Sequence, residues 1–134
     1  MADFYNRGSH GIHSLGVHNK GKTLSSSQVQ VIKLDDFWKD NISKQIGLLK
    51  IDVEGFESDV LEGCSYLLEN NKIDAIIFEF SPRIHKLRGI DIDAPIQILK
   101  KYNYDLFTTD GELFLFNKDD YPKICDLIAK PSIK

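Results

Sequence analysis

Two apolar runs of strand length, separated by a helical stripe, constrain the fold of this chain more than any other feature. Residues 47–53 read Gly-Leu-Leu-Lys-Ile-Asp-Val, and residues 73–80 read Ile-Asp-Ala-Ile-Ile-Phe-Glu-Phe. Nearly continuous apolar runs are typical of parallel strands that are covered on both faces. Between them, residues 57–70 carry apolar side chains at the spacing of one helix face. The pattern predicts a β-α-β unit.

Weaker patterns precede this unit. Residues 1–28 are rich in Gly, Ser, His and Asn and predict a polar N-terminal loop or disordered segment. Residues 29–34 nearly alternate between apolar and polar, which favours a short strand, and the two acids at residues 35–36 then begin a short helix. On this division, residues 29–134 form the folded part of the chain.

The C-terminal third predicts a helix, a hairpin and a last helix. Residues 93–103 begin with an Asp cap and a Pro in the first turn, which is typical of a helix start. Residues 104–108 and 112–117 are rich in β-forming residues, and the Asp-Gly pair between them is typical of a hairpin. Apolar spacing over residues 124–128 predicts a final helix. We therefore expect an α/β fold with a mostly parallel sheet that is closed by an antiparallel β-hairpin.

The composition limits the chain to one unit and narrows its partners. With 134 residues and 42% hydrophobic content, the chain can form one modest core. Its net charge of −3, with 17 dispersed Lys and Arg residues, offers no basic surface to nucleic acid. No apolar run reaches the roughly 20 residues of a membrane-spanning helix, and the polar opening lacks the apolar centre of a signal peptide. We expect a cytoplasmic protein that binds neither nucleic acid nor membrane.

Four acids fall at the C-terminal ends of the two central strands, where open α/β sheets bind ligands. Asp52, Glu54 and Glu57 follow the first strand, and Glu79 ends the second. Gly55 stands in the turn, where a side chain would oppose a tight backbone conformation. A purely structural interpretation is also open: Glu54 and Glu57 can be capping or solvated acids, and Asp52 an ordinary strand-end residue.

The segment around these acids is the strongest guide to function. Residues 49–57 read Leu-Lys-Ile-Asp-Val-Glu-Gly-Phe-Glu, which resembles the Lys-Ile-Asp-Val-Glu-Gly-x-Glu signature of FkbM methyltransferases. The Leu-Asp-Asp at residues 34–36 and the acid-ending strand at residues 76–79 are similar to flanking features of that family. The resemblance spans residues 8 to 117 and implies a partial Rossmann-like methyltransferase fold.

The resemblance implies an O-methyltransferase that depends on S-adenosylmethionine. Such enzymes move a methyl group to a hydroxyl, often on a sugar or a secondary metabolite, so the implied partner is a small-molecule or glycan acceptor. The acceptor hydroxyl must lose its proton as the new bond forms, and we expect Asp52 to take it. Glu54 and Glu57 are expected as further catalytic residues that position the acceptor. Carboxylate clusters also suit Mg²⁺ or Ca²⁺, but we assign no metal site.

Contacts with the acceptor are expected from Glu79 and from two histidines of the N-terminal segment. His10 and His13 titrate near neutral pH and could also remove a proton. The alternative is that both are ordinary polar loop residues, as we expect for His18 and His85.

The resemblance covers only the C-terminal part of the family's domain. A complete member has a first strand, a glycine-rich turn for the cofactor and a second strand that ends in an acid. The sequence contains none of these, so the cofactor-binding residues are unassigned and the chain alone can be inactive. The strand over residues 48–53 would then form a sheet edge with unpaired backbone groups. We expect a homodimer or pairing with a separate N-terminal half.

Three interpretations therefore stay open. The first is a methyltransferase that is completed by another chain. The second, of a different class, is a non-catalytic methyltransferase remnant that acts as an interaction module. The third is a flavodoxin-like or receiver-like domain in which strand-end acids bind Mg²⁺, although the acid spacing around Gly55 and the closing hairpin fit it poorly.

Overall fold

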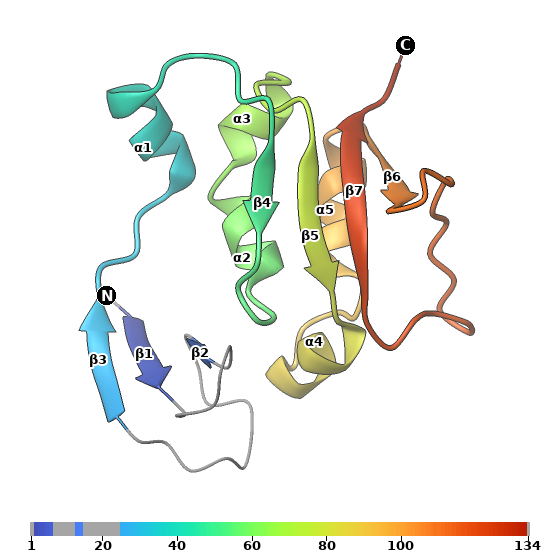
Figure 1. Ribbon diagram of the computed structural model, residues 1–134, viewed down its shortest axis with the longest axis horizontal. Helices are drawn as coiled ribbons and strands as arrows, with labels where there is room; N and C mark the ends of the chain where they lie inside the picture. Colours follow the sequence, from blue (N-terminus) through green and yellow to red (C-terminus); the bar gives the residue numbers. More distant parts are fainter. Residues whose placement is uncertain (1, 7–12, 15–24, 134) are drawn as a thin grey trace.

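The computed structural model describes residues 2–6, 13–14 and 25–133 of the chain. In this part of the chain, strands form two separate sheets, and helices pack beside the larger one (Figure 1). The strands are β1 (Ala2–Asn6), β2 (His13–Ser14), β3 (Ser25–Val29), β4 (Leu49–Ile51), β5 (Ile76–Phe80), β6 (Tyr104–Thr108) and β7 (Cys125–Pro131). The helices are α1 (Leu34–Asn41), α2 (Glu57–Glu62), α3 (Ser65–Glu69), α4 (Pro82–Arg88) and α5 (Ala94–Lys101).

A four-stranded sheet in the order β4-β5-β7-β6 forms the centre of the fold. β4 and β5 run parallel, with Ile51 beside Phe78. β7 runs antiparallel to both of its neighbours, β5 and β6. The α/β class is confirmed, but the prediction of a mostly parallel sheet is wrong, because the insertion of β7 between β5 and β6 makes the sheet mixed.

The predicted β-α-β unit is present, but its helix is in two pieces. α2 and α3 are separated by Gly63 and Cys64. Asp35 of α1 occupies this break, where its carboxylate accepts hydrogen bonds from the backbone N–H groups of Tyr66 at 2.9 Å and Leu67 at 3.2 Å. The acid therefore satisfies donors at the start of α3 and complements the positive end of that helix. The helix predicted to begin at residues 35–36 is confirmed as α1.

Two helices follow β5, and only one of them was predicted. α4 begins at Pro82, whose fixed φ suits the first helical position, and ends at Gly89 in the left-handed conformation, at φ 73°. α5 confirms the helix predicted over residues 93–103 and carries Pro95 in its first turn. α4 lies beyond the C-terminal end of β5, at the same end of the sheet as the loop that follows β4 (Figure 1).

The C-terminal third differs most from the prediction. The hairpin turn is present, since the backbone N–H of Thr108 donates to the carbonyl of Glu112 at 2.8 Å. Residues 112–117 form no continuous strand, however, and the partner of β6 is β7. The final helix predicted over residues 124–128 is also wrong, because this segment enters β7, where Leu127 is buried in the core. Apolar spacing over so few residues is compatible with either a helix face or a strand face.

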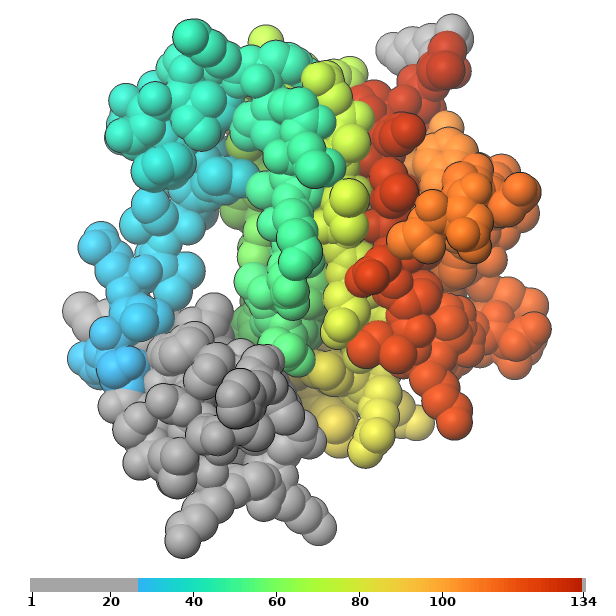
Figure 2. All heavy atoms as spheres, viewed as in Figure 1, coloured from blue at the N-terminus to red at the C-terminus, as the bar shows by residue number. Residues whose placement is uncertain are grey.

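The hydrophobic core lies on one face of the central sheet. α2, α3 and α5 cover this face (Figure 1). Along β5, Ile76, Phe78 and Phe80 are buried, whereas Ile77 and Glu79 are half-buried on the opposite face. Figure 2 shows that the strands themselves form the surface over β4, β5 and β7 on this opposite face. Within the described residues the sheet is therefore covered on one face only, contrary to the expectation of strands covered on both faces.

The N-terminal segment contains backbone strands. β1 pairs antiparallel with β2 and β3, and Ala2 lies beside Val29. These strands fall within the segment expected to be a loop or disordered, and the rest of that segment lies outside the described residues. The strand predicted over residues 29–34 lies earlier in the chain, as β3, which ends at Val29. Val31 and Ile32 are exposed beyond it. Among the described helices, none has the length and apolar character needed to cross a bilayer.

Candidate functional site

The loop between β4 and α2 sets the position of the acids that follow β4. Glu54 and Gly55 both have left-handed backbone conformations, at φ 53° and 95°. This conformation costs a residue with a side chain about 1 kcal/mol, whereas glycine adopts it freely. A Cβ added at Gly55 would lie 2.3 Å from Cγ2 of Ile84 in α4. The loop therefore passes directly against α4, and the expected role of Gly55 in a tight turn is confirmed.

Arg88 of α4 holds the same loop by its guanidinium group. It donates hydrogen bonds to the carbonyl of Gly55 and, at 2.7 Å, to the carboxylate of Asp59. The guanidinium also lies 3.7 Å from the centroid of the Phe56 ring, which is a cation–π contact. These contacts hold the loop against α4.

The buried side chain of Glu57 connects the loop to α4. One carboxylate oxygen accepts the backbone N–H of Gly55 at 3.0 Å, and the other lies 3.3 Å from Nε2 of His85. Both side chains are buried, and Nδ1 of His85 lies 3.0 Å from the carbonyl oxygen of Ile92. Both ring nitrogens of His85 therefore lie within hydrogen-bond distance of an oxygen atom, which fixes the ring between Glu57 and Ile92. The expectation that His85 is an ordinary polar loop residue is therefore wrong.

The remaining predicted acids, Asp52, Glu54 and Glu79, lie at the C-terminal ends of β4 and β5, and we call them the acid edge. Burial raises the pKa of Glu54, and the charges of Asp52 and Glu57 raise it further. Burial also raises the pKa of Glu79, followed by repulsion from the neighbouring acids. Burial and the charges of neighbouring acids thus make Glu54 and Glu79 more basic than isolated carboxylates.

A groove of about 230 Å³ opens at the acid edge. Its lining residues are Lys50, Ile51, Asp52, Ile77, Phe78, Glu79 and Asp126. Asp52 is exposed and accepts a hydrogen bond from Nζ of Lys50 at 3.0 Å. Asp126 was missed from the sequence, because it reaches the groove only through the pairing of β7 with β5, which sets it beside Glu79.

The predicted histidines of the N-terminal segment cannot be placed at the site, and two residues of α4 were not predicted to lie there. His10 lies outside the described residues, and only the backbone of His13 is described, in β2. Their contacts with an acceptor stay predictions. His85 and Arg88 were missed because α4 was not predicted, although a Pro at its start and a Gly after its end are helix-boundary signals. In the described part of the chain, no group of three or more His, Cys, Asp and Glu residues could hold a metal ion.

Comparison with known families identifies the domain that contains the acid edge. The profile described as the Methyltransferase FkbM domain matches residues 1–106. The chain belongs to the FkbM methyltransferase family. No curated protein and no solved structure matches it. The match includes β4, β5 and the whole acid edge, and β7 lies beyond it. The resemblance noted in the sequence is thus confirmed.

The FkbM signature of this chain has two structural roles. Asp52 and Glu54 lie at the acid edge, where Asp52 is exposed and Glu54 half-buried. Gly55 and Glu57 are buried and build the loop, through the close approach to α4 and the contact with His85. The geometry of Glu57 is that of a positioning residue, and its predicted catalytic role stays a prediction.

Proposed function

We propose that this chain is the C-terminal portion of an S-adenosylmethionine-dependent O-methyltransferase that acts on a hydroxyl of a sugar or a secondary metabolite. Membership of the FkbM family supports methyl transfer. The observation that carries the proposal further is the acid edge, where burial and the charges of neighbouring acids raise the pKa values of Glu54 and Glu79. An acid edge at the ends of parallel strands is where α/β enzymes place their chemistry.

In this proposal the acid edge removes the proton of the acceptor. The acceptor oxygen would form its new O–C bond to the methyl carbon as the bond between that carbon and the cofactor's sulfur breaks, with the electron pair left on sulfur, and the hydroxyl proton would pass to a carboxylate. A raised pKa favours this role, because a general base works best when its pKa approaches the working pH. Glu79 lines the groove and has a raised pKa, so it joins Asp52 as a candidate base. Asp52 is the more exposed of the two, and it is free to hold the cofactor when Glu79 takes the proton.

The acid edge also suits the proposed cofactor. Carboxylates accept hydrogen bonds from ribose hydroxyls and attract positive groups, so Asp52 and Glu54 are the residues we assign to hold it. When bound, S-adenosylmethionine supplies a methyl group on a positively charged sulfur. The acids would thus serve both to attract the cation and to keep the acceptor oxygen aligned with the methyl carbon.

We also propose that β4 pairs with a further strand, either in a second copy of this chain or in a separate N-terminal half. β4 is an edge of the central sheet in the described residues. Leu48, which directly precedes it, is 56% exposed. An apolar sheet edge of this kind favours association.

A second function, of a different class, is a non-catalytic interaction module. The same exposed edge of β4 favours it, because association needs no cofactor site. Cofactor binding discriminates between the two functions, since only the methyltransferase must bind S-adenosylmethionine.

Calorimetric titration with S-adenosylhomocysteine, the demethylated product, tests the proposed function. We expect binding in the micromolar range, weakened about tenfold or more by Asp52→Asn. Asp105→Asn, an exposed substitution of the same kind on β6, is the matched control and should leave the affinity unchanged. A folded chain that does not bind, alone or mixed with an N-terminal half, would favour the interaction module.

A further inference from the structure

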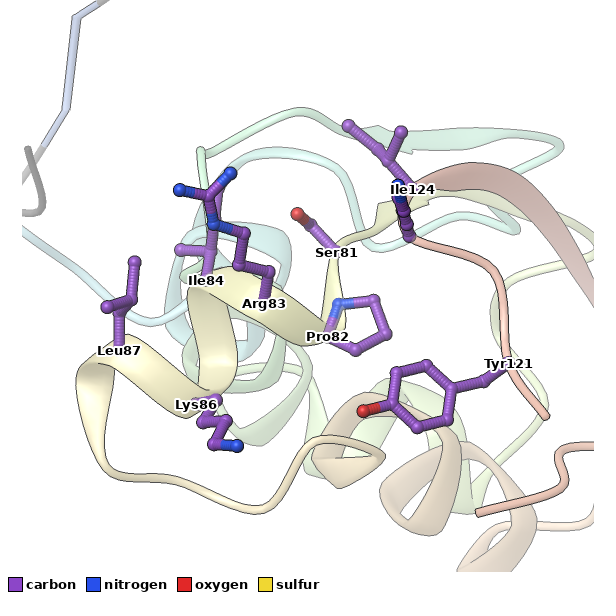
Figure 3. Close-up of a pocket in the computed structure, with 9 residues that line it drawn as sticks. Ser81, Pro82, Arg83, Ile84, Lys86, Leu87, Tyr121 and Ile124 are labelled. Atoms are coloured by element: carbon purple, nitrogen blue, oxygen red, sulfur yellow. The ribbon is translucent and has the colours of Figure 1, made fainter. Parts of the chain in front are cut away.

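A second and larger cavity lies beyond the C-terminal end of β5. Its volume is about 610 Å³, and it is formed by α4 and by residues 121–124, which lead into β7 (Figure 3). The lining residues are Ser81, Pro82, Arg83, Ile84, Lys86, Leu87, Tyr121, Lys123 and Ile124. We call it the α4 groove. Neither the family signature nor the acid edge includes any of these residues.

The α4 groove lies at the same end of the sheet as the acid edge. Ser81 follows Glu79 by two residues, at the point where β5 passes into α4. Residues 121–124 precede the N-terminal end of β7, whose Asp126 is paired with Glu79. A ligand that spans from the groove to the acid edge therefore needs to pass only the ends of β5 and β7.

One part of the groove wall is apolar and aromatic. Leu87 and Ile124 are 59% and 57% exposed. Figure 3 shows the ring of Tyr121 reaching from the segment before β7 toward α4. Exposed apolar side chains that gather around a cavity mark a binding surface for apolar groups. Figure 3 shows Leu87 across α4 from Tyr121, so the ring of Tyr121 is the part of this wall that fits a ring or another flat apolar body.

The other part of the wall is positively charged. Arg83, Lys86 and Lys123 line the groove, and no acid does. In the described part of the chain, none of the three forms an ion pair with an acid. Three uncompensated cations are notable in a chain of net charge −3. Their field favours an anionic ligand over a neutral one.

A buried hydroxyl completes the groove. Ser81 is only 4% exposed, and its side chain does not cap α4. Its hydroxyl has no hydrogen-bond partner among the residues that the structure describes. Buried polar groups nearly always form a hydrogen bond. Ser81 lines the α4 groove, which is the open space beside its hydroxyl. Ser81 can therefore donate to an oxygen of a bound molecule.

We propose that the α4 groove binds the acceptor, and that the acceptor is an anionic ring compound, such as a cyclic alcohol that carries a phosphate or a carboxylate. Arg83, which points to the same side of α4 as Ser81 in Figure 3, holds the anionic group, Ser81 donates to one of its oxygens, and Tyr121 packs on the ring. Lys86 and Lys123 add to the positive field of the groove. This rests on the proposed methyltransferase function. The groove also explains how an anion can approach the acid edge, because its cations offset the repulsion from the carboxylates.

Binding of three probes to the purified chain tests the α4 groove without any methyl donor. Phenyl phosphate has both the ring and the anion, phenyl β-glucoside has the ring without the anion, and inorganic phosphate has the anion alone. We expect phenyl phosphate to bind about tenfold or more tightly than either of the others in calorimetry or NMR titration. Equal binding of phenyl phosphate and the glucoside would overturn the role of the cations. Equal binding of phenyl phosphate and inorganic phosphate would overturn the role of the ring wall.

Variants locate the site. Arg83→Gln, Lys86→Gln and Lys123→Gln should each weaken phenyl phosphate binding by about fivefold, the scale of one exposed charge contact. Ser81→Ala should weaken it by a similar factor, through a lost hydrogen bond. Lys100→Gln, the same change at an exposed position of α5, is the matched control. If Lys100→Gln weakens binding as much as the groove variants do, the effect is one of net charge and the site is wrong.

Comparison with cofactor binding separates the two proposals. If the chain binds S-adenosylhomocysteine but not phenyl phosphate, the methyltransferase function stands and the α4 groove is overturned. If it binds phenyl phosphate in the groove but not S-adenosylhomocysteine, the anion site stands and its assignment as an acceptor site is overturned.

Discussion

Single residues decide the shape of the loop that carries the acid edge. Gly55 is the clearest example, because it combines a left-handed backbone at φ 95° with a close approach to Ile84. Glu54 has a similar backbone conformation and, as a residue with a side chain, bears the strain. Strain of this kind persists only where surrounding contacts impose it, and here Arg88 donates to the next carbonyl along the chain.

Replacement of Gly55 should separate backbone strain from steric overlap. Gly55→Ala is expected to lower the free energy of unfolding by about 3 kcal/mol, because it adds both strain and a clash with Ile84. Gly89→Ala is the matched control, since Gly89 has φ 73° but open space around it, and it should cost only about 1 kcal/mol. Urea denaturation measures both. Equal losses in the two variants would mean that Ile84 moves aside freely.

Glu79 should make the stability of the chain depend on pH. Its pKa is raised on folding above the ordinary value of 4.5, so the folded chain binds the proton more tightly than the unfolded chain does. The free energy of unfolding therefore falls as the pH rises from 4.5 through the raised pKa, and it is constant above both. Glu79→Gln removes this loss.

We expect Glu79→Gln to stabilise the chain at pH 7 by at most about 1 kcal/mol, because the carboxylate is partly solvated. The gain should disappear when the pH is lowered below 4.5. Thermal unfolding across this range measures it, with Glu69→Gln at an exposed position of α3 as the control. A gain that is the same at both ends of the range would rule out titration of Glu79 as its cause.

At the scale of elements, α4 holds the loop between β4 and α2 in position. Ile84 and Arg88 contact that loop at Gly55, and His85 contacts Glu57 at the start of α2. The same helix forms a wall of the α4 groove with other residues. α4 thus links the position of the acid edge to the shape of the groove, although it was absent from the sequence prediction.

Loss of His85 should remove the contact between α4 and Glu57 and lower the free energy of unfolding. His85→Ala leaves the carboxylate of Glu57 buried without its partner, and such a loss costs about 3–5 kcal/mol. Lys86→Ala, at the next and exposed position of α4, should cost less than about 0.5 kcal/mol. The double variant with Glu57→Ala should lose less than the sum of the two single variants, because they share one interaction. Additive losses in urea denaturation would mean that the two side chains are not coupled.

At the scale of the whole molecule, the described residues leave an open sheet edge and an open sheet face. β4 is an edge strand, and the face of the sheet opposite α2, α3 and α5 forms the surface in Figure 2. Val31, Ile32 and Leu48 are each more than half exposed in the segments that lead to α1 and β4. These features favour association of the chain with another polypeptide.

Association should depend on the edge of β4. We expect the purified chain to self-associate as its concentration rises, and Leu48→Lys to reduce this, because a charge on a sheet edge opposes pairing. Leu115→Lys is the matched control, since Leu115 is 73% exposed but lies in the segment after β6. Sedimentation velocity over a concentration series measures both. A monodisperse monomer at high concentration would contradict the prediction.

The sequence by itself determined the β-α-β unit, the short helix at α1, the helix at α5 and the family. Each of these rests on local signals: continuous apolar runs, helical spacing, and a signature of consecutive residues around Asp52 and Gly55. Such signals depend on neighbours along the chain, and sequence reasoning reads them directly. It also placed Asp52, Glu54 and Glu79 at one edge, because the C-terminal ends of parallel strands meet there.

Only the tertiary structure decided the rest. Residues 125–131 form a strand because they pair with β5 on one side and with β6 on the other. The pairing with β5 brings Asp126 beside Glu79. Glu57 is buried because His85 of α4 lies against it, 28 positions along the chain. The α4 groove joins Ser81 and Tyr121, which no local pattern connects. Contacts between distant segments determine which side chains are covered and which stay open, and these contacts form only when the chain packs.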